Sequence, residues 1–157
     1  MTTNNHDVAL VAHLMRRAGF GASRTELEGL AEKGYDAVVE DLLNPEANPK
    51  IDEDTLYRYL PMIEVPNTPP HARMKWLYWM TNTQRQLQEK VALFWHHVFA
   101  TGNAKVASHT DMLLQIGMFR ENGMGNLRDL LVRVGKDPAM IFWLDNNENH
   151  KREPNEN

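Results

Sequence analysis

Apolar residues recur every three to four positions through most of this sequence, and no segment sustains an alternation of apolar and polar residues. The first spacing places apolar side chains along one side of an α-helix, whereas a half-buried β-strand requires the second. Glycine, proline and asparagine interrupt the pattern at short intervals, and these residues end helices. The sequence therefore predicts an all-α fold, an irregular bundle of about seven to nine helices that ends in a polar C-terminal tail.

The interruptions divide the predicted single domain, residues 1–157, into four parts. Residues 8–43 contain the N-terminal helices, residues 44–69 form a connector with five prolines, and residues 70–144 contain the core helices. Residues 145–157 form a polar, Asn-rich motif. The predicted helices are 8–17, 24–32, 35–43, 53–60, one that opens at Pro70, 83–100, 109–121, 126–135 and 138–144. The side chains expected in or beside the core are Trp76, Leu77, Trp79, Phe94, Trp95, Leu130 and Phe142.

Composition narrows the classes of partner. The 17 Lys and Arg residues against 21 Asp and Glu give a formal charge of −4 without a basic stripe, so we expect no nucleic-acid partner. No apolar run approaches the roughly 18 residues that span a bilayer, and the first residues lack the features of a signal peptide. We therefore expect no membrane partner and a cytoplasmic location for the sequence as written. The absence of cysteine excludes disulfides and thiolate metal sites.

The first candidate site is cationic. His13, Arg16 and Arg17 are spaced i, i+3 and i+4, so they share one side of a helix. Two guanidinium groups and an imidazole in this arrangement can bind a carboxylate or phosphate. The alternative is an ordinary solvated helix surface.

The second candidate is His96. On a helical wheel it points away from the apolar stripe that includes Trp95, onto a line shared with Glu89 and Leu93. We expect it to be partly buried beside the Glu89 carboxylate, which would raise its pKa and fix its tautomer for acid–base work or metal ligation. The alternative is a structural histidine hydrogen-bonded between helices. His97 points about 100° from His96 and is the weaker candidate.

The third candidate is the polar tail. Asp145, Asn147, Asn149 and Glu156 occupy positions one, three, five and twelve of a calcium-loop frame, but His150 stands where that loop needs glycine. The alternatives are a looser cation site and a hydrogen-bonded Asn-rich turn. A metal site would combine these four residues with His96, and its cofactor would be a divalent cation.

Short motifs spread from about residue 8 to the C-terminus carry a family resemblance. They are His13-Leu-Met-Arg-Arg-Ala-Gly-Phe-Gly21, Leu87-Gln-Glu-Lys90, Phe94-Trp-His96 with Phe99-Ala-Thr101, Asn126-Leu-Arg-Asp-Leu130, Asp137-Pro-Ala-Met140, and Leu144-Asp-Asn146 with Pro154-Asn-Glu-Asn157. Together they resemble the large bacterial family called domain of unknown function 1800. Because the function of that family is uncharacterised, the resemblance implies kinship rather than chemistry.

The resemblance also implies how much of a protein this sequence represents. Family members continue after the Pro-Asn-Glu-Asn motif into a further helix and a long additional segment. We therefore expect an N-terminal fragment, an incomplete domain whose partner is the remainder of its own polypeptide beyond residue 157. Many relatives carry an export signal, which opposes the cytoplasmic expectation. Many relatives also have a second histidine at the position of Val98, so His96 is the one histidine of that pair that this sequence retains.

Three functions follow from these candidates. The first is a binding or structural module within a larger protein. The alternative is part of a metal-assisted hydrolase or lyase, with His96, Asp145 and Glu156 in the catalytic site and residues beyond 157 completing it. The third is an anion-binding module that uses His13, Arg16 and Arg17.

Overall fold

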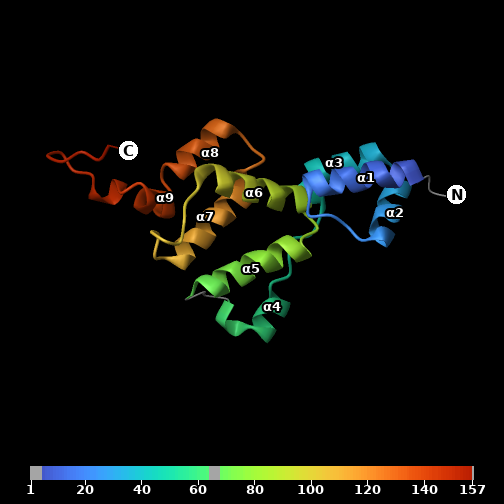
Figure 1. Cartoon of the computed structure of the whole chain (residues 1–157), viewed down its shortest axis with the longest axis horizontal. Helices are drawn as coiled ribbons and strands as arrows, with labels where there is room; N and C mark the ends of the chain where they lie inside the picture. The colour runs from blue at the N-terminus through green and yellow to red at the C-terminus, as the bar shows by residue number, and fades with distance from the viewer. Residues whose placement is uncertain (1–4, 64–67, 157) are drawn as a thin grey trace. The chain divides into compact units, whose positions relative to one another are not determined.

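The computed structural model describes residues 5–63 and 68–156, and it confirms the all-α class (Figure 1). In these residues no strand forms, and an isolated bridge joins His150 and Glu153. The α-helices are α1 (Asn5–Ala18), α2 (Arg24–Lys33), α3 (Tyr35–Leu43), α4 (Asp54–Tyr59), α5 (Pro69–Asn82), α6 (Gln86–Phe99), α7 (His109–Asn122), α8 (Leu127–Val134) and α9 (Pro138–Trp143). Short 3₁₀ helices occur at Pro45–Ala47, Pro61–Ile63 and Asn146–Glu148. None of the described helices is long and apolar enough to cross a bilayer.

The chain divides into two compact units. The first unit comprises Met1–Ile51 and Trp79–Lys90, and the second comprises Asp52–Tyr78 and Val91–Asn157. Helices α5 and α6 each contribute residues to both units. The prediction of a single domain over residues 1–157 stays a prediction.

The first unit packs α1, α2 and α3 around a small core (Figure 1). Val11, Met15 and Val38 are buried at its centre. Local signals set the bounds of α2. Ser23 and Glu26 form a capping box, in which Ser23 N donates to Glu26 Oε2 at 2.7 Å and Glu26 N donates to Ser23 Oγ at 3.4 Å. Gly34 then ends the helix at φ 96°, a conformation that glycine adopts at little cost.

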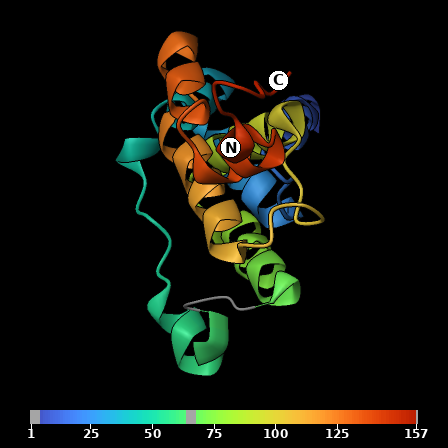
Figure 2. The ribbon, with the colours of Figure 1, turned by 90° about the vertical axis from the view of Figure 1, so that its left-hand side faces the viewer.

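The second unit packs the later part of α6 with α7, α8 and α9. Ala92, Phe119 and Leu130 are buried at the centre of its main cluster. A second cluster joins Val106, Met112 and Ala139, and the Trp143 ring packs against both clusters. Figures 1 and 2 show α9 lying against α7, as its contacts require. Asn126 and Asp137 cap α8 and α9 with their side chains, at the two helix starts that the sequence predicts.

Trp95 makes a close contact with the turn that follows α7. Its Nε1 donates a 2.8 Å hydrogen bond to the carbonyl of Gly123. A Cβ atom on Gly123 would lie 2.8 Å from Trp95 Cδ1 and 2.5 Å from the carbonyl oxygen of Phe119. Because Gly123 has an ordinary helical φ of −66°, the close approach of the Phe119 carbonyl and the Trp95 ring, not the backbone angle, requires glycine here.

The predicted core is correct only in part. Trp79 and Leu130 are buried, and Trp76 and Trp95 are half-buried. The prediction is wrong for three residues that are about half exposed: Leu77 at 54%, Phe94 at 55% and Phe142 at 52%.

The orientation of α6 explains the error at Phe94. The helix turns the side that carries Ala92, Trp95 and Phe99 toward the main cluster, which leaves Phe94 and Val98 exposed. Alanine contributes little to an apolar pattern. The large exposed residues therefore dominated the pattern, and the predicted apolar side of the helix was rotated toward them.

The start of α6 also differs from its prediction. The helix begins at Gln86 instead of residue 83. The hydroxyl of Thr83 accepts a 2.9 Å hydrogen bond from Arg85 N, a local turn that competes with helix formation. Arg85 in turn donates from Nε to the carbonyl of Asn48 at 2.8 Å, which ties this turn to the connector within the first unit.

Candidate functional site

The second unit contains a pocket of about 240 Å³ formed by α5, the end of α6, the loop after it and α7. Its apolar wall includes Trp76 and Ile116. The polar side chains that line it are Arg73, His96, Thr101, Asn103 and His109. Proteins bind small molecules in concave, mostly apolar sites with a few convergent polar groups, and this pocket has that character.

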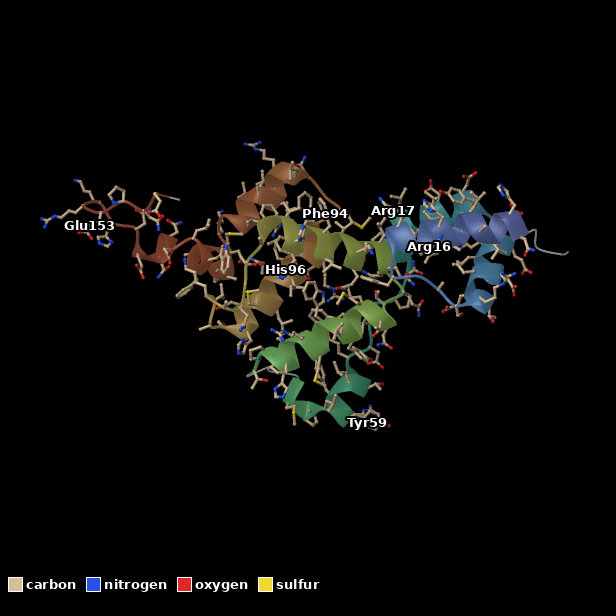
Figure 3. The ribbon with its side chains drawn as sticks, in the orientation of Figure 1. Arg16, Arg17, Tyr59, Phe94, His96 and Glu153 are labelled. Carbon is tan, nitrogen blue, oxygen red and sulfur yellow. The ribbon has the colours of Figure 1, made fainter. Side chains whose placement is uncertain are left out.

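His96 is the least satisfied polar group in the pocket. It lies in the last turn of α6 and is half-buried, as predicted. Its Nδ1 atom is buried and, within the described residues, has no hydrogen-bond partner. The ring meets Trp76 edge to face, with centroids 5.0 Å apart. In Figure 3 His96 and Phe94 lie on different sides of α6. Burial lowers the pKa of His96 below its ordinary value of 6.5, so the ring is neutral near pH 7.

The expected influence of Glu89 on His96 is wrong. We predicted a carboxylate that raises the pKa of His96, whereas burial of the ring lowers that pKa. Within the described residues, Nδ1 of His96 neither accepts nor donates a hydrogen bond, so it has no bond to the Glu89 carboxylate. Glu89 is buried in the first turn of α6, and His96 is in the last. A shared line on a helical wheel says nothing about the separation of the two residues along the helix axis.

His109 is the second imidazole of the pocket, and sequence reasoning missed it. It is the first residue of α7, a helix capped by Ser108, whose hydroxyl accepts from Asp111 N at 3.2 Å. Its Nδ1 lies 2.5 Å from Oδ1 of Asn103. An amide oxygen can only accept a hydrogen bond, so Nδ1 is the donor in this contact, and in the neutral ring the lone pair is then on Nε2. The cap pattern marks the start of α7, but no sequence signal brings Asn103 back to it.

A buried chain of hydrogen bonds lies behind the pocket wall and was also missed. The hydroxyl of Thr101 donates to Oε1 of Gln115, and Gln115 Nε2 donates to Asp137 Oδ1 at 2.7 Å. The same Asp137 oxygen accepts from Met140 N at 2.9 Å and caps α9. Burial raises the pKa of Asp137 even though these hydrogen bonds favour the charged form. The chain thus connects the pocket residue Thr101 to the start of α9.

The predicted tail residues do not line the pocket with His96. Asp145 forms an ion pair with Lys105, 2.5 Å from Nζ to Oδ2. Asn149 Oδ1 accepts from Asn155 N at 3.1 Å, and Asn155 Nδ2 donates to the carbonyl of Leu144 at 2.9 Å. Figure 3 shows the loop that carries Glu153 well apart from His96. The tail thus contains hydrogen bonds of the Asn-rich turn, one of the two alternatives in the sequence, and the looser cation site stays a prediction.

No metal centre is evident in the described part of the chain, where no three His, Asp or Glu side chains are grouped to hold an ion. Asn147 and Glu156 are exposed. The structure therefore does not assemble the predicted ligands His96, Asp145, Asn147, Asn149 and Glu156 around one point. Their ligand and catalytic roles stay predictions.

The cationic candidate lies in the first unit. His13, Arg16 and Arg17 are exposed on α1, and Figure 3 labels the two arginines near its C-terminal end. Positive charge in the last turn is favourable to a helix whether or not an anion binds. An anion-binding role for the three residues stays a prediction.

Comparison with known proteins places the pocket inside a recognised domain. A family model described as "Protein of unknown function (DUF1800)" matches residues 13–157. The chain belongs to this family. The matched range contains every residue that lines the pocket in this DUF1800 chain. No curated protein and no solved structure matches it.

The buried state of His96 predicts a dependence of stability on pH. Because the pKa of His96 is lower in the folded than in the unfolded chain, its contribution is present above the ordinary value of 6.5 and is lost as pH falls through the folded value. We expect urea unfolding between about pH 8 and about pH 5 to show this loss. His96→Gln should reduce the difference in the free energy of unfolding between about pH 8 and about pH 5. His13→Gln, a control at an exposed histidine, should leave that difference unchanged. An unchanged pH dependence in His96→Gln would contradict the assignment.

Proposed function

We propose that this DUF1800 domain is a binding module whose pocket takes a small organic anion with an apolar body. The observation that carries the proposal is the buried, unpartnered Nδ1 of His96 at the pocket wall. A buried polar group without a partner costs about 1–3 kcal/mol. A ligand that completes its hydrogen bonding is stabilised by the recovery of part of that cost.

The other lining groups support an anion. Arg73 contributes a guanidinium to the pocket, and none of the described lining residues is acidic. A guanidinium binds a carboxylate through two parallel hydrogen bonds, and a neutral imidazole can donate a third. Trp76 and Ile116 offer surface for an apolar body. The chemistry of the pocket therefore fits an aromatic or branched carboxylate better than an amine or a polyol.

Three probes with the same ring test the preference for charge. Benzoate, benzamide and benzamidine carry a negative, neutral and positive group, and we expect affinity to fall in that order. The expected ratio between benzoate and benzamidine is about tenfold or more, which corresponds to about 1.4 kcal/mol. Nuclear magnetic resonance titration would measure the three affinities and show whether the His96 ring signals move.

Matched arginine variants locate the site. Arg73→Gln should remove the preference for benzoate, and Arg16→Gln, the same change at an exposed arginine of α1, should not. If Arg16→Gln removes the preference and Arg73→Gln does not, the predicted site at His13, Arg16 and Arg17 is the better proposal. Equal affinity for the three probes would contradict an anion-binding pocket.

The second candidate, part of a metal-assisted hydrolase or lyase, draws support from the same pocket. Two imidazoles line it, and Nε2 of His109 has a free lone pair when Nδ1 donates to Asn103. Two nitrogen ligands fall short of the three that catalytic zinc sites use, so further ligands would have to come from elsewhere. A rise in melting temperature with Zn²⁺ or Mn²⁺ that His96→Ala abolishes would favour this candidate.

The expectation of a large intramolecular partner also stays a proposal. Leu127, Leu131 and Val132 on α8 are about half exposed. Apolar side chains grouped on one short helix often mark a surface that another segment covers.

A further inference from the structure

The loop between α6 and α7 forms one wall of the pocket and is fixed at both ends. It brings Thr101, Gly102 and Asn103 to the pocket. At its start Ala100 has a left-handed backbone with φ 48°. At its other end Val106 is buried, with 1% of its surface exposed, and both Lys105 N and Val106 N donate to the carbonyl of Gly102. We call residues 100–106 the pocket loop.

The end of α9 and the two residues after it support the outer side of the pocket loop. Lys105 Nζ donates to the carbonyl of Trp143 at 2.8 Å and to the carboxylate of Asp145 at 2.5 Å. The Trp143 ring lies directly over Gly102, since a Cβ atom there would be 3.2 Å from its Cζ3. The pocket loop thus has the pocket on one side and residues 143–145 on the other.

Backbone conformation singles out the same contact. Among the described residues, Ala100 and Asp145 are the non-glycine residues with positive φ, at 48° and 56°. Such conformations cost free energy for residues other than glycine and persist where the surroundings determine them. Ala100 lies at the start of the pocket loop, and Asp145 accepts the hydrogen bond from Lys105 of that loop.

We propose that residues 143–145 position His109, by holding the pocket loop so that Asn103 accepts the Nδ1 proton of that ring. The support runs from Asp145 and the Trp143 carbonyl through Lys105 to the pocket loop, and from Asn103 to His109. Asp145, a candidate ligand in the sequence, is then a positioning residue that acts through Lys105. The inference rests on the proposed function only in that it concerns the same pocket, because the tautomer of His109 exists without a ligand.

Loss of the lysine tests the proposal. In the unliganded wild-type chain, long-range ¹⁵N spectra should show His109 with its proton on Nδ1. In Lys105→Ala, which removes both outer hydrogen bonds, we expect a measurable population with the proton on Nε2. We also expect benzoate binding to weaken by about tenfold, the effect of losing about one hydrogen bond. Lys105→Arg keeps a charged donor, so it should retain both the proton on Nδ1 of His109 and the wild-type affinity for benzoate.

Controls separate this proposal from general destabilisation and from the proposed function. Lys151→Ala removes an exposed lysine of the same tail and should leave the His109 spectrum unchanged. Asp145→Asn retains a residue that tolerates positive φ but removes the charge, so it should give a smaller shift in the same direction as Lys105→Ala. An unaltered His109 tautomer in Lys105→Ala overturns the positioning role. If the tautomer shifts while wild-type protein binds no benzoate, the positioning role stands and the anion-binding function fails.

Discussion

Phe119→Ala is expected to lower the free energy of unfolding by about 3–5 kcal/mol, the range for removal of a fully buried phenylalanine ring. Phe119 has no exposed surface and lies on α7 at the centre of the main cluster of the second unit. Its ring stacks on Phe99 with centroids 5.6 Å apart. The substitution removes this contact and leaves a cavity that the surrounding helices can fill only in part.

The same substitution at Phe142 is the matched control. Phe142 is 52% exposed, although the sequence placed it with the core. Its replacement by alanine should change the free energy of unfolding by about 1 kcal/mol or less, as substitutions at exposed positions do. Urea unfolding followed by circular dichroism measures both variants. A loss at Phe142 equal to that at Phe119 would show that the exposed side of α9 is packed in solution.

Gln115→Leu is expected to destabilise the second unit by about 2–4 kcal/mol, because two buried polar groups lose their partner at once. Gln115 is fully buried and joins the hydroxyl of Thr101 to the carboxylate of Asp137. Leucine has nearly the same volume, so loss of hydrogen bonds dominates over any cavity. Gln84→Leu, the same change at an exposed glutamine, should be close to neutral.

The loss in Gln115→Leu should also depend on pH. Asp137 already has a pKa above its ordinary value of 3.8 because it is buried, and the hydrogen bond from Gln115 opposes that rise. The contribution of Asp137 to the free energy of unfolding is therefore favourable below pH 3.8, and it is lost as pH rises through the pKa of Asp137 in the folded chain. Removing the amide raises the folded pKa further, so the deficit should be larger near pH 7 than near pH 4. Unfolding curves at both pH values give the comparison, and an equal deficit would argue against a charged Asp137 in the chain.

Local signals explain why the helices were predictable. Ser23 with Glu26, Asn126, and Asp137 with Pro138 each satisfy or replace backbone donors within a few residues, so the helix starts are encoded next to the helices. Packing between helices is not encoded in this way. Ala92 is fully buried while Phe94 is half exposed, and only the identity of the neighbouring helices decides between those two sides of α6.

The candidate site shows the same division between local and distant information. The helical wheel correctly placed His96 away from Trp95 and half-buried, since its position on α6 follows from helix geometry. The second imidazole depends on a loop that returns Asn103 to His109, and the buried chain depends on Gln115 meeting Asp137 from another helix. The density of oxygen atoms in the tail predicted ligands, and the pairing of Asp145 with Lys105, forty residues earlier, carries no local signal.

Gly123 shows what this packing implies for the evolution of the chain. A side chain at Gly29 or Gly117 would meet open space, so drift can alter those positions with little effect on their surroundings. At Gly123 the Phe119 carbonyl oxygen and the Trp95 indole occupy the volume that any Cβ atom would need. A side chain there requires both a smaller residue in place of Trp95 and a shift of the α7 backbone at Phe119, so single mutations at Gly123 should be rejected. Invariance of this glycine among descendants would then record the close packing of a ring and a helix end, and would be no sign of a role in binding.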